Sequence, residues 1–120
     1  MPIVDIEIVL KADEIIHSEI VEELADQLGE IFGSPSGTTW VKVHTLANDH
    51  YAESGGMPDR VFPVFVSILK SKLPGKEEMQ NEVERITGAV AQICGRPSGN
   101  VHIIYLHEGR DRVAFGGKLV

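Results

Sequence analysis

The segment Gly-Ser-Pro-Ser-Gly at 33–37 recurs, with one substitution, as Gly-Arg-Pro-Ser-Gly at 95–99. The two segments lie 62 residues apart (33 to 95), and the apolar residues before each segment match at the same spacing. The matched pairs are Val21 with Val83, Leu24 with Ile86, Leu28 with Val90, and Ile31 with Ile93. Such a series in constant register indicates that the 120-residue chain is one domain, 1–120, built from two similar halves, about 1–60 and 61–120.

The first half has the pattern of a strand, a helix and a second strand. Over 4–10, apolar residues alternate with acidic ones, which is the period of a strand. Asp13 is a suitable N-cap for a helix that ends near Phe32, and Gly33 suits the position after its last turn. Strand character returns over 39–46, so the first half is predicted to be one β-α-β unit.

The second half repeats this order. We expect a strand over 62–70, a helix over 76–94 and a strand over 100–106, followed by a short closing element at Gly116–Gly117. Two tandem β-α-β units predict an α+β fold in which a four-stranded sheet carries both helices on one face. A chain of this length has nothing left to cover the other face, so we expect it to self-associate.

Composition excludes several classes of partner. Eighteen acidic and eleven basic residues give a net charge of −7, so the chain has no general attraction for nucleic acid or for an anionic membrane. Its single cysteine, Cys94, allows no internal disulfide, and the histidine spacing does not suggest a metal site. There is no apolar run of membrane-spanning length and no signal-peptide pattern, so we expect a cytoplasmic protein.

The first residues suggest chemistry at the N-terminus. Removal of Met1 would leave Pro2 with a free secondary amine. An ordinary α-amine has a pKa of about 7.7–8.0, and burial or a neighbouring cation lowers it toward neutral pH, where the free base can accept a proton. The alternative is that Pro2 merely begins an edge strand, where its missing N–H does no harm.

The chain as a whole resembles the tautomerase superfamily. The resemblance rests on Met1-Pro2-Ile3 leading into a strand, on the doubled unit, and on the stretch Asn-Val-His-Ile-Ile-Tyr at 100–105 followed by Phe-Gly-Gly at 115–117. That superfamily includes 4-oxalocrotonate tautomerase, macrophage migration inhibitory factor, malonate semialdehyde decarboxylase and chloroacrylic acid dehalogenases. The resemblance implies a homotrimer in which Pro2 is the catalytic base of a keto-enol isomerase, acting on a small anionic oxo-acid without cofactor or metal.

Two other functions fit the same resemblance. One is hydration, dehalogenation or decarboxylation of a small acid on the same scaffold, which would require a carboxylate to activate water. The other is a non-enzymatic binding or signalling role in which the proline is vestigial.

The resemblance also points to residues that would hold the substrate carboxylate. Lys70 and Lys72 stand where the decarboxylase and dehalogenase branches have two arginines. Lysines one residue apart project to the same side of an extended chain, so we expect both to bind one carboxylate and to lower the pKa of the amine. Lysine lacks the bidentate fork of arginine, and a solvated pair that ends a strand is the alternative. Arg112, near the closing element, is a further candidate for this anion site.

The remaining candidates are one polar residue and four apolar or aromatic ones. His102 stands where 4-oxalocrotonate tautomerase has an arginine and the inhibitory-factor branch has a tyrosine, so it is expected to donate to a substrate oxygen across a subunit interface. We expect a hydrophobic wall beside the amine from Trp40, Tyr51, Val113 and Phe115. Ordinary strand packing is the alternative for each of these residues.

Overall fold

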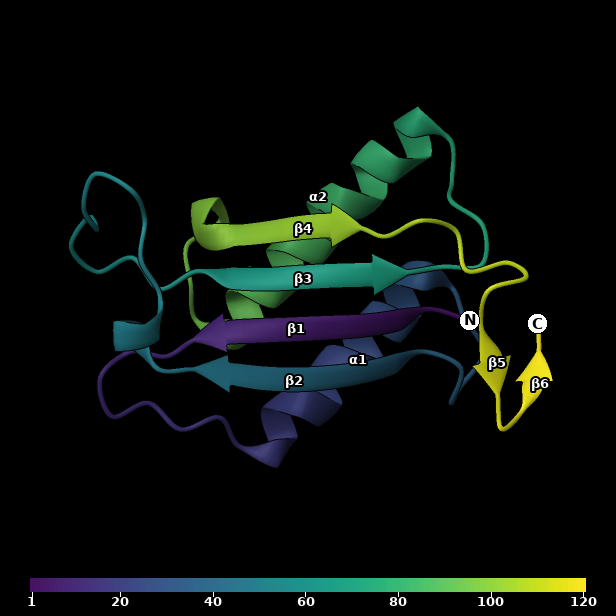
Figure 1. Ribbon diagram of the computed structural model, residues 1–120, viewed down its shortest axis with the longest axis horizontal. Helices are drawn as coiled ribbons and strands as arrows, with labels where there is room; N and C mark the ends of the chain where they lie inside the picture. The colour runs from purple at the N-terminus through teal and green to yellow at the C-terminus, as the bar shows by residue number, and fades with distance from the viewer.

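Two β-α-β units share one four-stranded sheet in the computed structural model, which describes residues 1–120 (Figure 1). The first unit consists of β1 (Ile3–Val9), α1 (Ser18–Phe32) and β2 (Trp40–Leu46). The second consists of β3 (Val64–Leu69), α2 (Lys76–Cys94) and β4 (Val101–Tyr105). Short 3-10 turns, η1 (Asn48–His50) and η2 (Ser98–Asn100), lie outside these elements, and a hairpin of β5 (Ala114–Phe115) and β6 (Lys118–Leu119) ends the chain.

The sheet has the strand order β2-β1-β3-β4. Strands are parallel within each unit, whereas β1 and β3 join the two units in antiparallel fashion, with Ile3 opposite Leu69. The predicted α+β architecture is therefore confirmed, and β2 and β4 remain as unpaired edges. Neither helix is long and apolar enough to cross a membrane.

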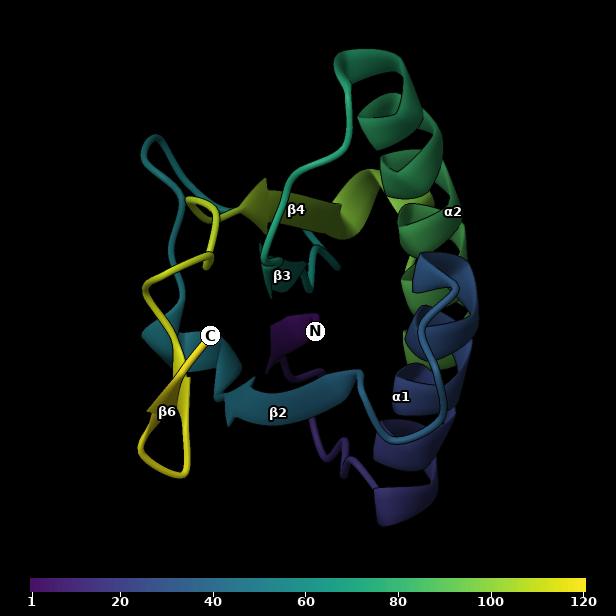
Figure 2. The ribbon, with the colours of Figure 1, turned by 90° about the vertical axis from the view of Figure 1, so that its right-hand side faces the viewer.

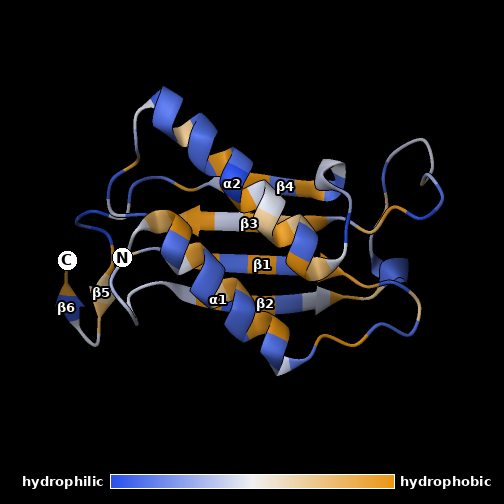
Figure 3. Cartoon of the chain, turned by 180° about the vertical axis from the view of Figure 1, so that it is seen from behind, coloured by the Kyte–Doolittle hydropathy of each residue, from blue (hydrophilic) through white to orange (hydrophobic).

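Strand alternation decides which side chains are buried. Val4, Ile6 and Ile8 of β1 are fully buried against the helices, which both cover this one face of the sheet (Figure 2). Both helices show alternating hydrophilic and hydrophobic bands along their length, as expected when one face of each is buried (Figure 3). The core residues are Val4, Ile6, Ile8, Leu24, Leu28, Val64, Val66, Ile68, Ile86, Val90, Ala91, Cys94 and Val101.

The first helix begins later than the sequence predicts. Asp13 is not its N-cap, because its φ of 61° lies in the left-handed region whereas an N-cap has extended backbone angles. The carboxylate of Glu14 instead accepts a hydrogen bond from the backbone N–H of Lys11 at 3.0 Å and pairs with Arg96, so this stretch is a loop. The predicted helix end is confirmed, since Gly33 has a φ of 63° and caps α1.

The face opposite the helices is open in the single chain. Asp5, at its centre, lies 3.2 Å from the ammonium of Lys42 and 3.5 Å from the imidazole of His44. Large apolar side chains near the edges are exposed: Trp40 by 51%, Ile104 by 53% and Leu106 by 42%. The C-terminal hairpin lies on this open side, at the end of the sheet where β1 begins (Figures 1 and 2).

Candidate functional site

Pro2 directly precedes β1, a central strand of the sheet, and is buried. Its carbonyl oxygen accepts a hydrogen bond from the backbone N–H of Trp40 at 3.0 Å, which fixes it beside the first residue of β2. The alternative of a proline on an edge strand does not apply, because β1 is flanked by β2 on one side and by β3 on the other.

An apolar cavity of about 290 Å³ adjoins this position. It is lined by Met1, Ile3, Gly37, Thr38, Trp40 and Phe115. Pro2 does not line the cavity itself, but its two neighbours in the chain, Met1 and Ile3, both do. Removal of Met1 would therefore expose a secondary amine beside an apolar wall.

The wall is built from two segments that are far apart in the sequence. The rings of Trp40 and Phe115 meet edge to face with their centroids 5.1 Å apart, and the indole N–H of Trp40 donates to the carbonyl of Gly37 at 3.1 Å. The C-terminal hairpin is closed by a backbone hydrogen bond from the N–H of Val120 to the carbonyl of Val113 at 2.8 Å. Two of the four predicted wall residues, Trp40 and Phe115, thus line one cavity with Met1.

Val113 lies at the same end of the sheet. Gly109 is buried between it and β3, because a Cβ at this glycine would lie 3.1 Å from Val113 and 3.3 Å from Leu69. Leu69 is opposite Ile3 in the antiparallel pairing of β1 and β3. Val113 therefore covers the strand next to the one that Pro2 begins, although it does not line the cavity itself.

Lys70 lies on the helix side of the sheet, in an ion pair. Its ammonium is 2.9 Å from Glu82 of α2, and the two side chains are only 18% and 13% exposed. The other carboxylate oxygen of Glu82 accepts a hydrogen bond from the hydroxyl of Tyr105, and burial together with this bond raises the pKa of Tyr105. The ring of Phe32 lies 5.0 Å from the same ammonium. Lys70 is thus fully engaged within its own subunit.

Lys72 differs from Lys70 in its surroundings. The chain bends at Ser71 and Lys72, so the extended geometry assumed from the spacing does not continue past the strand. Lys72 is exposed and has no ion-pair partner. The adjacent residue, Leu73, lines a polar hollow with Arg112, which places these two cationic residues on neighbouring segments but outside the apolar cavity.

His102 and Tyr51 lie toward the opposite end of the sheet. His102 is exposed on the open face near the start of β4, with its ring 5.5 Å from that of Phe65, and the ring of Tyr51 lies 5.9 Å from Phe65. The hydroxyl of Tyr51 donates to Glu53 at 2.7 Å, a bond that raises its pKa. Neither residue is brought to Pro2 of its own chain, so they can meet a Pro2 only in another copy.

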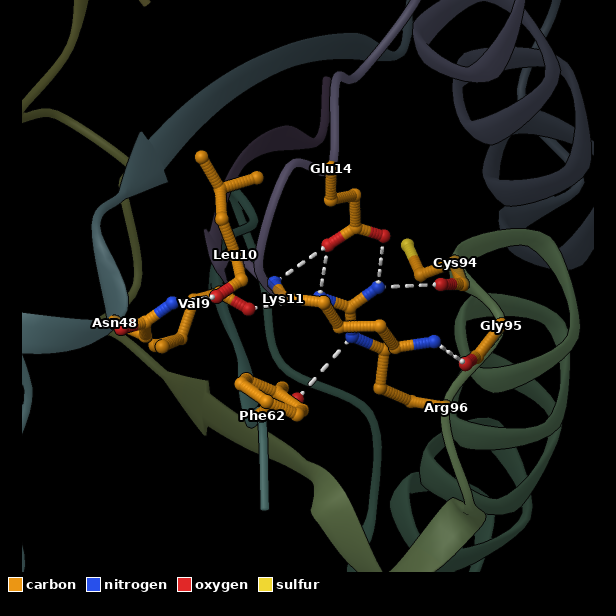
Figure 4. A network of polar contacts seen from close by, with 9 residues as sticks. All are labelled: Val9, Leu10, Lys11, Glu14, Asn48, Phe62, Cys94, Gly95 and Arg96. Carbon is orange, nitrogen blue, oxygen red and sulfur yellow. Dashed lines mark hydrogen bonds and ion pairs between the residues drawn. The ribbon is translucent and has the colours of Figure 1, made fainter. Parts of the chain in front are cut away.

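At the opposite end of the sheet, Pro63 precedes β3 as Pro2 precedes β1. A buried cation, Arg96, forms a network of polar contacts at this end (Figure 4). Arg96, whose side chain is fully buried, makes two 2.6 Å hydrogen bonds to Glu14. It also donates to the backbone carbonyls of Val9, Phe62 and Cys94, at 2.7, 3.2 and 2.8 Å. The guanidinium therefore has a structural role at this end of the sheet.

Sequence reasoning missed both Arg96 and Glu82. A signal existed for Arg96, because it is the one residue that differs between the two repeated segments, where Ser34 is its counterpart. Ser34 donates instead to the carbonyl of Gly29 at 3.3 Å and is also in hydrogen-bond contact with Thr39. Glu82 gave no signal, since it is one of many acidic residues on the helices.

Solved structures share this fold. Macrophage migration inhibitory factor from Trichinella spiralis matches with a TM-score of 0.77 at 14% identity, over 98% of this chain and 99% of that one. A fused 4-OT, solved as a symmetric trimer, matches with a TM-score of 0.79 at 12% identity, over 98% and 94%. The FG41 malonate semialdehyde decarboxylase, inhibited by 3-bromopropiolate, matches with a TM-score of 0.71 at 17% identity, over 95% and 88%.

These matches cover nearly the whole chain, and they confirm the resemblance to the tautomerase superfamily at the level of the fold. No protein-family model matches the sequence, and no curated protein matches it significantly.

Proposed function

We propose that this chain is a cofactor-independent tautomerase in which Pro2, after removal of Met1, is the general base for a small enolisable oxo-acid. The observation that carries the proposal is the position of Pro2, buried directly before a central strand and between Met1 and Ile3, which both line an apolar cavity. The shared fold with macrophage migration inhibitory factor and a fused 4-OT supports it.

The proposed reaction needs one base and a place for the developing charge. The free amine of Pro2 takes the proton from the carbon next to the carbonyl, and the C–H electron pair moves to form the enolate. The resulting ammonium then returns the proton to the oxygen or to a different carbon, which completes the isomerisation. The rings of Trp40 and Phe115 shield the amine from water and so favour its neutral form.

The substrate's polar groups require partners from outside the cavity. Lys72, exposed and unpaired, is the proposed partner of the carboxylate, with Arg112 close to it in the fold. His102 of a neighbouring subunit is proposed to donate to the enolate oxygen, because within one chain it lies toward the other end of the sheet. Because His102 would come from a neighbouring subunit, the site would be complete only in the oligomer.

A second candidate is decarboxylation at the same amine, which the match to the malonate semialdehyde decarboxylase favours. Chemistry that adds water would require a carboxylate at the site. No acidic residue lines the apolar cavity. Glu53 accepts a hydrogen bond from Tyr51, and Glu108 lines the polar hollow that also contains Arg112. Isomerisation, which needs only the amine, is therefore better supported than hydration or hydrolytic dehalogenation.

The direct test of the function is turnover of phenylpyruvate by protein that begins at Pro2. A keto-enol interconversion that depends on the free amine supports a tautomerase. Correct assembly without any turnover would favour a binding or signalling role instead.

We expect the protein to be a homotrimer of three times 13.1 kDa. The exposed Trp40, Ile104 and Leu106 on the open face and the free edges of β2 and β4 all require partners, and the fused 4-OT of the same fold is a symmetric trimer. Sedimentation equilibrium at micromolar concentration measures the mass directly. A stable monomer there would contradict the oligomeric site.

Replacing Lys72 should weaken binding of the substrate carboxylate. We expect Lys72→Ala to raise KM for phenylpyruvate about tenfold with little change in kcat, because an exposed cation that binds the carboxylate equally throughout the reaction contributes about 1.4 kcal/mol or less. Lys76→Ala is the matched control, since Lys76 is also an exposed lysine but belongs to α2. Equal effects of the two substitutions would remove Lys72 from the site.

A further inference from the structure

Glu82 occupies an unusual position for an acidic residue on a helix. Its side chain is 13% exposed, and both of its carboxylate oxygens are engaged, one by the ammonium of Lys70 at 2.9 Å and the other by the hydroxyl of Tyr105. The other acidic residues near it on α2, such as Glu84, are exposed to solvent. A buried carboxylate of this kind needs its cation, because removing one partner would leave the other charge uncompensated.

This ion pair lies at the end of the sheet where β1 begins. Ile3 is opposite Leu69 in the antiparallel ladder, so the next position along places Pro2 opposite Lys70. Residues at these two positions face the same side of the sheet, the side that carries the helices. Lys70 therefore follows the strand that neighbours Pro2, and its ammonium is directed to Glu82 of α2 at 2.9 Å.

Other charged groups at this end are more exposed. Lys72 follows β3 in solvent, and Arg112 shares its hollow with Glu108 and Asp111. On the open face, Asp5 of β1 is paired with Lys42 of β2 at 3.2 Å, and the side chains of Glu30 on α1 and Lys118 on β6 are exposed to solvent. The pair of Lys70 and Glu82 is therefore the main buried source of charge near the amine.

We propose that Glu82 is a positioning residue that holds Lys70 on the helix side and offsets its charge, so that of the two lysines only Lys72 remains free to bind a substrate carboxylate. The inference rests on the proposed role of Pro2 as the base. An unpaired Lys72 at the same end of the sheet as the apolar wall suits a monocarboxylic oxo-acid with an apolar body. A dicarboxylic oxo-acid would bring a second negative charge, which Lys70 cannot bind while it is paired with Glu82.

Neutralising Glu82 should therefore change both the amine and the choice of substrate. In Glu82→Gln the positive charge of Lys70 is uncompensated, which disfavours the prolyl ammonium and lowers the Pro2 pKa by about 0.5 unit, a modest Coulomb effect over several ångströms. The same free charge should lower KM several-fold for oxaloacetate, a dicarboxylate, and less for phenylpyruvate. Lys70→Met should act in the opposite direction and raise the Pro2 pKa, because it leaves the carboxylate of Glu82 behind.

The experiment uses the processed protein labelled with ¹⁵N-proline, in which NMR follows titration of the Pro2 amine without any need for turnover. Glu84→Gln is the matched control, since it removes the same charge from the exposed side of α2. The double variant Lys70→Met/Glu82→Gln removes both charges and should return the Pro2 pKa close to that of the wild type. It also tests the proposal if either single variant folds poorly.

The outcomes test the role of Glu82 separately from the role of Pro2 as the base. Opposite shifts in the single variants, cancelled in the double variant, would support the role of Glu82. Equal small shifts in Glu82→Gln and Glu84→Gln would overturn that role, and turnover by the wild type would then still support Pro2 as the base. If the wild type does not turn over either oxo-acid, the proposed function fails, and the NMR titration still decides whether Glu82 controls the amine.

Discussion

Protein that keeps Met1 is expected to turn over phenylpyruvate about a hundredfold or more slowly than protein that begins at Pro2, the contribution of a well-placed general base. The reason is chemical, because Met1 converts the nitrogen of Pro2 into an amide that cannot accept a proton. Met1 also lines the apolar cavity in which the substrate is proposed to bind. Intact-mass measurement identifies the two forms before their rates are compared.

The pH dependence of the two forms should also differ. For processed protein, kcat/KM should rise with pH as the prolyl ammonium loses its proton, and it should level off once the free amine predominates. Shielding by Trp40 and Phe115 disfavours the charged form, so the midpoint should lie below that of an unshielded prolyl amine. Protein that keeps Met1 has no such group and should show no corresponding rise.

Two controls complete this comparison. Both forms must have the same oligomeric state, since a site shared between subunits is lost on dissociation. Pro2→Ala still presents a primary amine after processing, so it should be slower than the wild type but faster than the form that keeps Met1. If the two forms of the wild-type chain give coincident profiles, Pro2 is not the base.

The fold could be predicted from the sequence because its main signals are local and occur twice. Repeated segments at 33–37 and 95–99 follow two apolar helical stripes, and the structure has a helix before each segment and a strand after it. The start of α1 could not be predicted in this way. It depends on Glu14, which pairs with Arg96, a residue 82 positions further along the chain.

The candidate site could be predicted only where the backbone fixes it. Pro2 follows from its position at the start of a strand, and Trp40 follows from the parallel pairing of β1 with β2. Lys70 and Lys72 looked equivalent because their spacing is that of one strand face. A bend after β3 and a partner from α2 make them different, and the spacing of the two lysines contains neither fact.

Replacing Arg96 should have the largest effect on stability. Arg96→Ala removes both bonds to Glu14 and three bonds to backbone carbonyls, and it leaves a largely buried carboxylate without its cation. Breaking a buried pair in this way costs about 3–5 kcal/mol, a large part of the 5–15 kcal/mol that stabilises a typical domain. Equilibrium urea unfolding at fixed protein concentration, monitored by circular dichroism, measures the difference.

A milder variant and a control guard against a protein that does not fold at all. Arg96→Lys keeps the charge but loses the planar fork, so it should cost less than Arg96→Ala and still remain folded. Lys11→Ala removes a single exposed bond, from the ammonium of Lys11 to the carbonyl of Gly95 at 3.0 Å, and should cost well under 1 kcal/mol. Similar losses for Arg96→Lys and Lys11→Ala would mean that the buried network contributes little.

The pH dependence of unfolding provides a separate test of the same network. Hydrogen bonding to Arg96 holds the pKa of Glu14 below its ordinary value of 4.5, so the native state binds fewer protons than the unfolded state in this range. The stabilisation that Glu14 provides should therefore be complete above pH 4.5 and be lost as the pH falls through the lowered pKa of the folded protein. Glu14→Gln lacks this titration, so its free energy of unfolding should lie below that of the wild type at neutral pH and approach it in acid. A difference between the two proteins that stays constant from neutral pH into acid would show that the Arg96 guanidinium does not stabilise the ionised form of Glu14.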